Sequence, residues 1–204
     1  MSKKILIYGA GGHTRSIIPL LKHNNFKISG IIDETYNANK PEVIIGIKLL
    51  GSEGYLTNDH TLVLSVGDNN KRKHLYHKYY EILFKENLIH PTLILENDVI
   101  IGQANQIFAK TFINSNTKIG NNNIINSGSI LEHECIIGNH NHIAVGTILG
   151  GRVRIGNNCF VGAGSVIIDK VSICDNAIIG ANSTVINDIT LPGTYVGQPV
   201  KRTK

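Results

Sequence analysis

Aliphatic residues recur at every sixth position through most of the second half of the chain. From Ile101 to Val185, fifteen consecutive positions at this spacing hold Ile, Leu or Val, and the series extends backward to Leu95 and Ile89. The residue four places after each aliphatic is mostly small, as at Ser129. A period of six matches neither the 3.6-residue period of an α-helix nor the simple alternation of a strand. It is typical of a parallel β-helix, in which each hexapeptide forms one short strand and one turn.

Three hexapeptides close one triangular coil of such a helix, so the stretch from Ile101 to Val185 holds between four and five coils. We expect glycine and asparagine at the turns to supply the left-handed backbone angles that corners demand. These residues are Gly102, Gly120, Asn121, Asn122, Gly138, Gly156, Asn157, Gly162 and Gly180. The unbroken register predicts that no long loop is inserted in this stretch.

The first 90 residues follow a different pattern of apolar and polar positions. Apolar runs predict strands at 5–8, 26–32, 43–45 and 62–66, and amphipathic patterns predict helices at 14–23 and 70–86. Strands and helices that alternate along a chain form a parallel sheet of βαβ units. Because Pro91 stops any helix and the hexapeptide series begins nearby, we place the domain boundary there. The expected fold is a Rossmann-like α/β domain, residues 1–90, followed by a parallel β-helix, residues 91–204.

Composition excludes several classes of protein. Hydrophobic residues make up 42% of the chain and charged residues 17%, which excludes a disordered chain. The net charge of +5 is spread along the sequence, so no basic face is concentrated enough for nucleic acid. The three cysteines form no paired motif, which favours a reducing compartment and no zinc site. No apolar run is long enough for a membrane span or a signal peptide, so we expect a cytoplasmic protein.

Two signals together indicate a known family. The first predicted strand ends in Gly9-Ala-Gly-Gly-His13, and the hexapeptides contain the segments NSGSILEHECIIG at 126–138, HIAVG at 142–146 and GGRVRIG at 150–156. This combination resembles the sialic-acid O-acetyltransferase and nucleotide-sugar N-acetyltransferase family over nearly the whole chain. The resemblance implies a left-handed β-helix, assembly as a homotrimer, acetyl-CoA bound between adjacent helices, and a nucleotide held by the first domain.

His133 is the expected catalytic base. It lies two places after the inward Leu131, so its side chain is expected to point out of the helix. An imidazole there suits removal of a proton from an acceptor that attacks the acetyl thioester. The resemblance implies that Glu134 orients this imidazole, although neighbouring side chains of a strand point to opposite faces and only a turn would join them. Glu132 is the alternative partner.

Gly151 lies one full coil after His133, so its N–H can stabilise an oxyanion there, although an ordinary corner glycine is the alternative. Residues that the resemblance implies for CoA binding are His142, Gly146, Gly151, Ala163, Gly164, Ala181, Lys201 and Arg202. The alternatives are a structural histidine at the trimer interface for His142, small corner residues for the glycines and alanines, and a charged tail for the last two. His140 is expected to be exposed and inert.

The turn after the first strand is the expected nucleotide site. The residues expected to bind substrate are Gly9, Gly11, Gly12, His13, Asp33, Asp68 and Asn69. The amides of the glycine-rich turn and the start of the following helix can receive a pyrophosphate. Thr14 stands where the dinucleotide fingerprint requires glycine or alanine, which disfavours an NAD site. Turn and helix-cap chemistry is the alternative for the polar residues.

These residues predict an acetyl-CoA-dependent N-acetyltransferase that acts on the 4-amino group of a nucleotide-activated amino-deoxy sugar for surface-glycan biosynthesis. No metal is expected, and the cysteines are expected to be small interior residues. The first alternative is O-acetylation of a sugar of the sialic-acid type. The second is a non-catalytic trimeric nucleotide-binding scaffold, and the third is a metal enzyme in which His133, His140 and His142 converge across chains.

Overall fold

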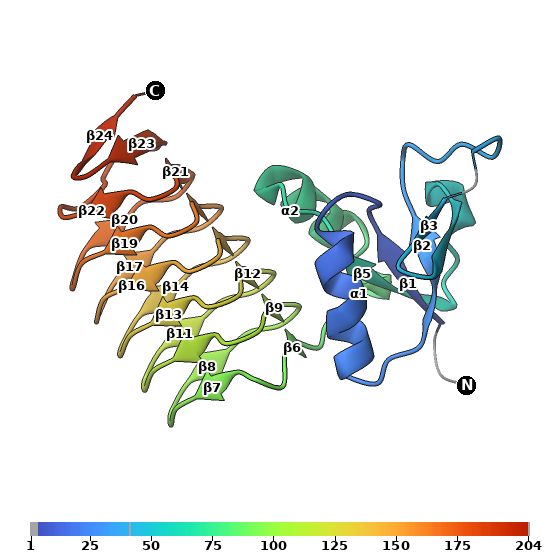
Figure 1. Cartoon of the computed structure of the whole chain (residues 1–204), viewed down its shortest axis with the longest axis horizontal. Helices are drawn as coiled ribbons and strands as arrows, with labels where there is room; N and C mark the ends of the chain where they lie inside the picture. Colours follow the sequence, from blue (N-terminus) through green and yellow to red (C-terminus); the bar gives the residue numbers. More distant parts are fainter. Residues whose placement is uncertain (1–3, 41, 204) are drawn as a thin grey trace. The chain divides into compact units, whose positions relative to one another are not determined.

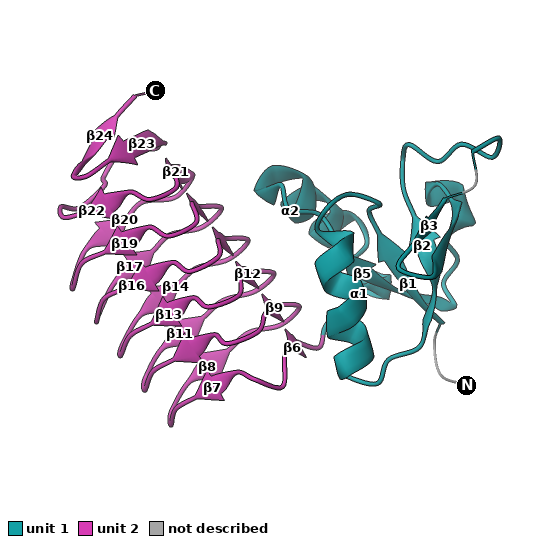
Figure 2. Cartoon of the chain, viewed as in Figure 1, with its two compact units in different colours: residues 1–85 teal, residues 86–204 magenta. Residues whose placement is uncertain are grey.

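The computed structural model describes residues 4–40 and 42–203, and the chain divides into two compact units, 1–85 and 86–204 (Figure 2). From the sequence, this boundary was expected after residue 90, five residues later. Strand β6 (Leu88–Ile89) pairs with β9 (Gln106–Ile107), so hexapeptide pairing begins before Pro91. No helix among the described residues has the length and apolar character needed to cross a membrane.

The first unit is built on a five-stranded sheet in the order β3-β4-β2-β1-β5 (Figure 1). Its strands are β1 (Lys4–Tyr8), β2 (Ile28–Ile32), β3 (Val43–Ile44), β4 (Ile47–Gly51) and β5 (His60–Leu64). β1 pairs in parallel with β2 and β5, and β2 pairs in parallel with β4. This confirms the Rossmann-like fold. Strand β4 was not predicted from the sequence. Ile45 and Gly46, with φ of 47° and 79°, form a tight turn after β3, so the chain returns as a second, antiparallel strand where only one strand, 43–45, was expected.

The two helices are α1 (Thr14–His23) and α2 (Asn69–Lys78), with short 3-10 turns η1 (Glu53–Tyr55) and η2 (Tyr80–Ile82). α1 has its predicted bounds, and its apolar side chains are buried. The prediction that the second helix runs to residue 86 is wrong. After η2 the chain extends, and the Phe84 N–H donates to the Leu62 carbonyl at 2.9 Å. Leu83 and Phe84 are thereby buried next to β5 instead of continuing the helix.

The second unit is the predicted left-handed parallel β-helix, with three sheets as its faces (Figure 1). One face holds β7 (Ile94–Leu95), β10 (Phe112–Ile113), β13 (Ile130–Leu131), β16 (Ile148–Leu149), β19 (Val166–Ile167) and β22 (Thr184–Val185). The second face holds β8 (Ile100–Ile101), β11 (Lys118–Ile119), β14 (Ile136–Ile137), β17 (Arg154–Ile155) and β20 (Ser172–Ile173). The third holds β6, β9, β12 (Ile124–Ile125), β15 (His142–Ile143), β18 (Phe160–Val161), β21 (Ala177–Ile179), β23 (Gly193–Gly197) and β24 (Val200–Arg202).

The repeated aliphatic side chains point inward and form one continuous core along this helix. Leu131, for example, pairs with Ile113 on one side and Leu149 on the other, and all three are fully buried. A column of asparagines accompanies them. Asn141 accepts a hydrogen bond from the Cys159 N–H at 2.7 Å, and its amide nitrogen donates to the Gly156 carbonyl at 2.9 Å. Polar groups inside the coils are therefore satisfied by side chains one coil away.

The glycines expected at the turns are not there to supply left-handed backbone angles, so that part of the prediction is wrong. Left-handed backbone angles recur at every sixth residue from Asp98 to Asn182, three places after each inward aliphatic residue. Of the glycines and asparagines that were expected to have such angles, only Asn122 has one. The glycines are required by close packing instead. A Cβ added to Gly102 would lie 2.7 Å from the Gly120 carbonyl oxygen of the next coil, which is too close for any side chain.

Candidate active site

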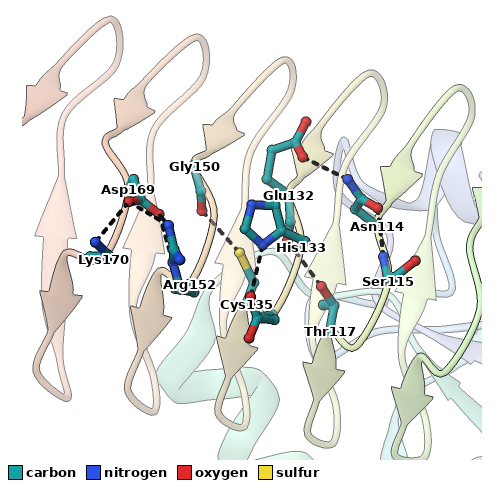
Figure 3. A network of polar contacts seen from close by, with 11 residues as sticks. Asn114, Ser115, Thr117, Glu132, His133, Cys135, Gly150, Arg152, Asp169 and Lys170 are labelled. Carbon is teal, nitrogen blue, oxygen red and sulfur yellow. Dashed lines mark hydrogen bonds and ion pairs between the residues drawn. The ribbon is translucent and has the colours of Figure 1, made fainter.

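His133 and Glu134 contact each other in the turn between β13 and β14. The Glu134 Oε2 atom lies 3.0 Å from the His133 Nδ1 atom, and both side chains are about half exposed. The contact exists because Glu134 has a left-handed φ of 59°, which returns its side chain toward its neighbour. Glu132 is engaged elsewhere, since its Oε2 accepts a hydrogen bond from Asn114 at 2.7 Å (Figure 3). Of the two carboxylates, Glu134 is therefore the one that holds the imidazole.

The other edge of the His133 ring lies against Gly151. A Cβ added to Gly151 would lie 2.5 Å from the His133 Nε2 atom, so only glycine leaves room for the ring. Within the described residues, the Gly151 N–H donates to no protein acceptor. The 18-residue stacking thus places the Gly151 backbone beside the His133 ring, which agrees with the spacing of the two residues in the sequence.

Asp169 is a neighbour of this place that the sequence analysis did not identify. The same added Cβ on Gly151 would lie 3.1 Å from the Asp169 Oδ1 atom. Arg152 binds the Asp169 carboxylate with three contacts of 2.9 to 3.1 Å, and Lys170 lies 3.8 Å from it (Figure 3). Asp169 lies one coil of 18 residues after Gly151, as Gly151 lies one coil after His133. The same spacing could therefore have identified Asp169 from the sequence.

Cys135, close in sequence to His133, is an interior residue. Its thiol is fully buried and donates to the Gly150 carbonyl at 3.2 Å. Burial raises the pKa of Cys135 to about 11, which keeps the thiol protonated and unsuited to nucleophilic attack. Among the described residues, no cluster of His, Cys, Asp or Glu side chains is placed to hold a metal ion.

The two histidines that follow lie apart from His133. His140 is buried, with its Nδ1 atom 2.8 Å from the Asn122 amide nitrogen, so the expectation of an exposed side chain is wrong. It occupies a corner with φ of 61°, where the side chain packs against the corner residue of the preceding coil. His142 lies on β15, on a different face of the helix from β13, and packs edge-on against the Phe160 ring at 5.2 Å.

Four small residues expected to bind CoA gather at another corner of the helix, whereas Gly151, also expected to bind CoA, lies against His133. Gly146 lies between β15 and β16, Ala163 and Gly164 lie between β18 and β19, and Ala181 lies between β21 and β22. His133 belongs to the corner between β13 and β14, so a single chain does not bring these residues together. Lys201 and Arg202 lie exposed on β24, and the Arg202 guanidinium donates to the Pro192 carbonyl at 2.8 Å.

In the first unit, the glycine-rich turn lies at the carboxyl end of β1. Gly9 has a φ of 117°, and a Cβ there would lie 2.5 Å from the Ser65 carbonyl oxygen. The Ala10 N–H donates to Asp33 Oδ2 at 2.8 Å. Burial alone would raise the pKa of Asp33, but hydrogen bonds from Thr35 and Ala10 lower it overall. The ionised Asp33 carboxylate thus holds the turn in place through the Ala10 N–H. Gly11, Gly12 and His13 connect the turn to α1.

Asp68 and Asn69 perform the cap and turn chemistry that the sequence analysis kept as their alternative. Asp68 accepts from the Lys71 N–H at 2.7 Å, and Asn69 accepts from the Arg72 guanidinium at 2.8 Å. Arg72 is fully buried and also donates to the Val66 and Gly67 carbonyls. Burial lowers the pKa of Arg72 to about 9. The burial of Arg72 was not predicted from the sequence, because a charged helix residue is usually solvated.

Two family models match the chain. Residues 4–79 match the PglD N-terminal domain, and residues 152–187 match the bacterial transferase hexapeptide with six repeats. No curated protein is recognisably similar in sequence. Both halves of the chain therefore have a family counterpart, in the same order as the two structural units.

Solved structures resemble the whole chain. PerB of Caulobacter crescentus, in complex with CoA and GDP-perosamine, is 27% identical with a TM-score of 0.87, over 98% of this chain and 97% of that chain. The acetyltransferase domain of PglB from Neisseria gonorrhoeae is 23% identical with a TM-score of 0.88, over 98% of this chain and 100% of that chain. WeeI of Acinetobacter baumannii is 20% identical with a TM-score of 0.82, over 98% and 99%. The chain thus combines a PglD N-terminal domain with the hexapeptide repeats of bacterial transferases, and over nearly its whole length it is similar to solved structures of acetyltransferases that carry both parts.

Proposed function

We propose that the protein transfers the acetyl group of acetyl-CoA to the 4-amino group of a nucleotide-linked amino-deoxy sugar, for surface-glycan biosynthesis. The observation that carries the proposal is the placement of His133 between Glu134 and the Gly151 backbone. The 27%-identical PerB, which binds CoA and GDP-perosamine, supports the same pair of substrates. O-acetylation of a sialic-acid-type sugar is the alternative within this class.

Each residue of this arrangement has one chemical task. The acceptor amine attacks the thioester carbonyl, and His133 Nε2 removes the proton that the nitrogen must lose. Glu134 fixes the ring through Nδ1 and stabilises the imidazolium that forms. The Gly151 N–H donates to the oxygen that becomes negative in the tetrahedral intermediate. Collapse of that intermediate expels CoA as a thiolate and leaves the acetylated amine.

Acetyl-CoA is proposed to lie between two chains of a homotrimer. The small residues Gly146, Ala163, Gly164 and Ala181 at one corner let the pantetheine arm approach the backbone, with His142 beside it and with Lys201 and Arg202 for the phosphates. Their separation from His133 within one chain supports a site shared between neighbouring chains. Outward-facing apolar residues, among them Ile148 at 38% exposure, supply a surface that a neighbour would cover.

The nucleotide is proposed to bind the turn that contains Gly9, Gly11, Gly12 and His13. The conformation of this turn is fixed by Asp33, and the loop of Asp68 and Asn69 is fixed by Arg72. Both loops follow neighbouring parallel strands, β1 and β5, where ligands of open α/β sheets commonly bind. Their roles are to present backbone N–H groups to the ligand.

Thiol release from acetyl-CoA tests the reaction. The acceptors are UDP-, dTDP- and GDP-linked 4-amino-4,6-dideoxy sugars, with sialic acid and its CMP form as the oxygen acceptors. Turnover with one amino sugar supports N-acetylation, and turnover with sialic acid alone replaces it by the O-acetyl alternative. Binding of CoA without turnover on any acceptor would reject the proposed acceptor class, while a protein that binds no CoA would fit the scaffold alternative.

Glu134→Gln should lower kcat at least about tenfold, because the imidazole loses the anion that orients it and stabilises its protonated form. The KM for acetyl-CoA should stay within about twofold, since the carboxylate acts on the ring and not on that substrate. Glu132→Gln is the matched control, and its kcat should remain unchanged because that carboxylate binds Asn114. Equal effects of the two variants would show that Glu134 has no special role.

A further inference from the structure

A groove with a volume of about 660 Å³ lies beside the His133–Glu134 contact. It is formed entirely by the β-helix and is called the basic groove below. Its lining residues are Asn116, Lys118, Glu134, Ile136, Arg152, Arg154 and Lys170. Glu134 belongs both to this groove and to the contact with His133, so whatever occupies the groove lies next to the reacting groups.

The coil repeat stacks these side chains in two columns. Asn116, Glu134, Arg152 and Lys170 take the same corner position in four successive coils, with left-handed φ between 59° and 67°. Lys118, Ile136 and Arg154 stand side by side on the paired strands β11, β14 and β17. Strands of a sheet lie about 4.8 Å apart, so the backbones at Lys118 and Arg154 are separated by about 10 Å, with Ile136 between them.

The charges of the basic groove are only partly neutralised. Arg152 and Lys170 both face the Asp169 carboxylate, at 2.9 Å and 3.8 Å. Lys118 and Arg154 are exposed, and neither forms an ion pair with any residue that the structure describes. Four cationic side chains against the carboxylates of Glu134 and Asp169 leave an excess of two positive charges. An excess of this size beside a catalytic residue fits a doubly charged anion.

We propose that the basic groove binds phosphoryl groups of a substrate, with Lys118 and Arg154 as their principal partners. A guanidinium offers a planar fork of donors to phosphate oxygens, and an ammonium offers a compact charge beside it. The inference rests on the proposed function, because the two substrates named there both carry phosphate esters. Neither Lys118 nor Arg154 has a role in the coil itself, since both side chains point outward from the sheet.

Of these two sources of phosphate, the acceptor fits better. In a nucleotide-linked 4-amino sugar, one pyranose ring separates the amine from the diphosphate. In acetyl-CoA, the whole pantetheine arm separates the thioester from the phosphates. Because Glu134 joins the groove to His133, a phosphate in the groove lies close to the reacting nitrogen, as the sugar-linked phosphate of the acceptor would. The glycine-rich turn proposed for the nucleotide then receives the nucleoside end of the same substrate.

The test uses the full chain with the double variant Lys118→Gln and Arg154→Gln. The KM for the nucleotide sugar should rise about tenfold, with kcat and the KM for acetyl-CoA unchanged, because charge-assisted hydrogen bonds to the phosphates are lost. The control is the double variant Lys22→Gln and Lys48→Gln, which removes the same charge from exposed positions of the first unit. A rise in the KM for acetyl-CoA alone would also support a phosphoryl site, with CoA as the source. Unchanged KM values for both substrates would overturn the proposal.

A binding measurement keeps this test separate from the proposed reaction. Titration calorimetry with sodium pyrophosphate should show affinity in the wild type that falls about tenfold in the groove variant and not in the control. If no amino sugar is turned over but this difference is found, the groove is supported and the proposed acceptor is rejected. If turnover occurs and pyrophosphate affinity is equal in both variants, the groove proposal fails alone. Circular dichroism melting curves verify that the variants are folded.

Discussion

Replacement of His133 by glutamine is expected to lower kcat about 10³-fold, because general base catalysis by a positioned histidine contributes roughly two to four powers of ten. The KM for acetyl-CoA should change by less than about threefold, since the ring acts on the proton of the acceptor. The amide of glutamine is of similar size, so the contact with Gly151 is disturbed little. Steady-state thiol release with saturating substrates measures the effect.

The control for this variant is His23→Gln, which changes an exposed histidine at the carboxyl end of α1. Its kcat should match that of the wild type. If His133→Gln keeps more than a third of the wild-type kcat, the proton leaves the acceptor by another route. His133 would then be one exposed histidine of a turn, and the contact with Glu134 would have no catalytic meaning.

Asn141→Ala is expected to lower the free energy of unfolding by about 3 kcal/mol. The substitution leaves the Cys159 N–H without its acceptor and the Gly156 carbonyl without its donor. Because the Asn141 side chain is fully buried, water does not replace it, and each unsatisfied group costs about 1–3 kcal/mol. Urea unfolding at one fixed protein concentration, followed by circular dichroism, measures the loss.

Asn139→Ala is the matched comparison for Asn141→Ala. Asn139 makes hydrogen bonds of the same kind, accepting from the Asn121 N–H and donating to Asn157, but it is only partly buried. Water can take over its contacts, so the expected loss is about 1 kcal/mol. Losses of equal size in the two variants would show that burial does not decide the contribution of these asparagines.

The β-helix was predictable because one physical requirement repeats. Each inward position must hold an aliphatic residue, and fifteen such positions in a row exclude other periodic folds. Positions that depend on packing between coils were not predictable in the same way. The turn glycines were assigned to left-handed angles, whereas Gly102 and Gly120 are needed for the close approach of the next coil. A sequence shows that a residue lacks a side chain, but not which neighbour requires it.

The candidate site shows the same division. The spacing between His133 and Gly151 predicted their stacking, since one coil separates them. The contact of His133 with Glu134 depends on the left-handed backbone angle of Glu134. A glutamate in a sequence does not indicate such an angle. The pairing of Arg152 with Asp169 was not predicted, because a single arginine and a single aspartate are ordinary surface residues. Only the coil geometry shows that they pair with each other beside the histidine.

Because a left-handed residue recurs at every sixth position, the β-helix requires a sequence that keeps this six-residue phase throughout. Deleting one residue between Asp98 and Asn182 would shift every later aliphatic residue off the interior, so the whole carboxyl-terminal remainder would lose its core. Removal or duplication of a complete coil would leave all later turns in phase. Such a change is tolerable before Asn114, but between Asn114 and Lys170 it would separate His133, Gly151 and Asp169. After Lys170 it would displace residues that are proposed to bind CoA. The length of the β-helix can therefore vary only in whole coils, and only outside the coils that carry the proposed chemistry.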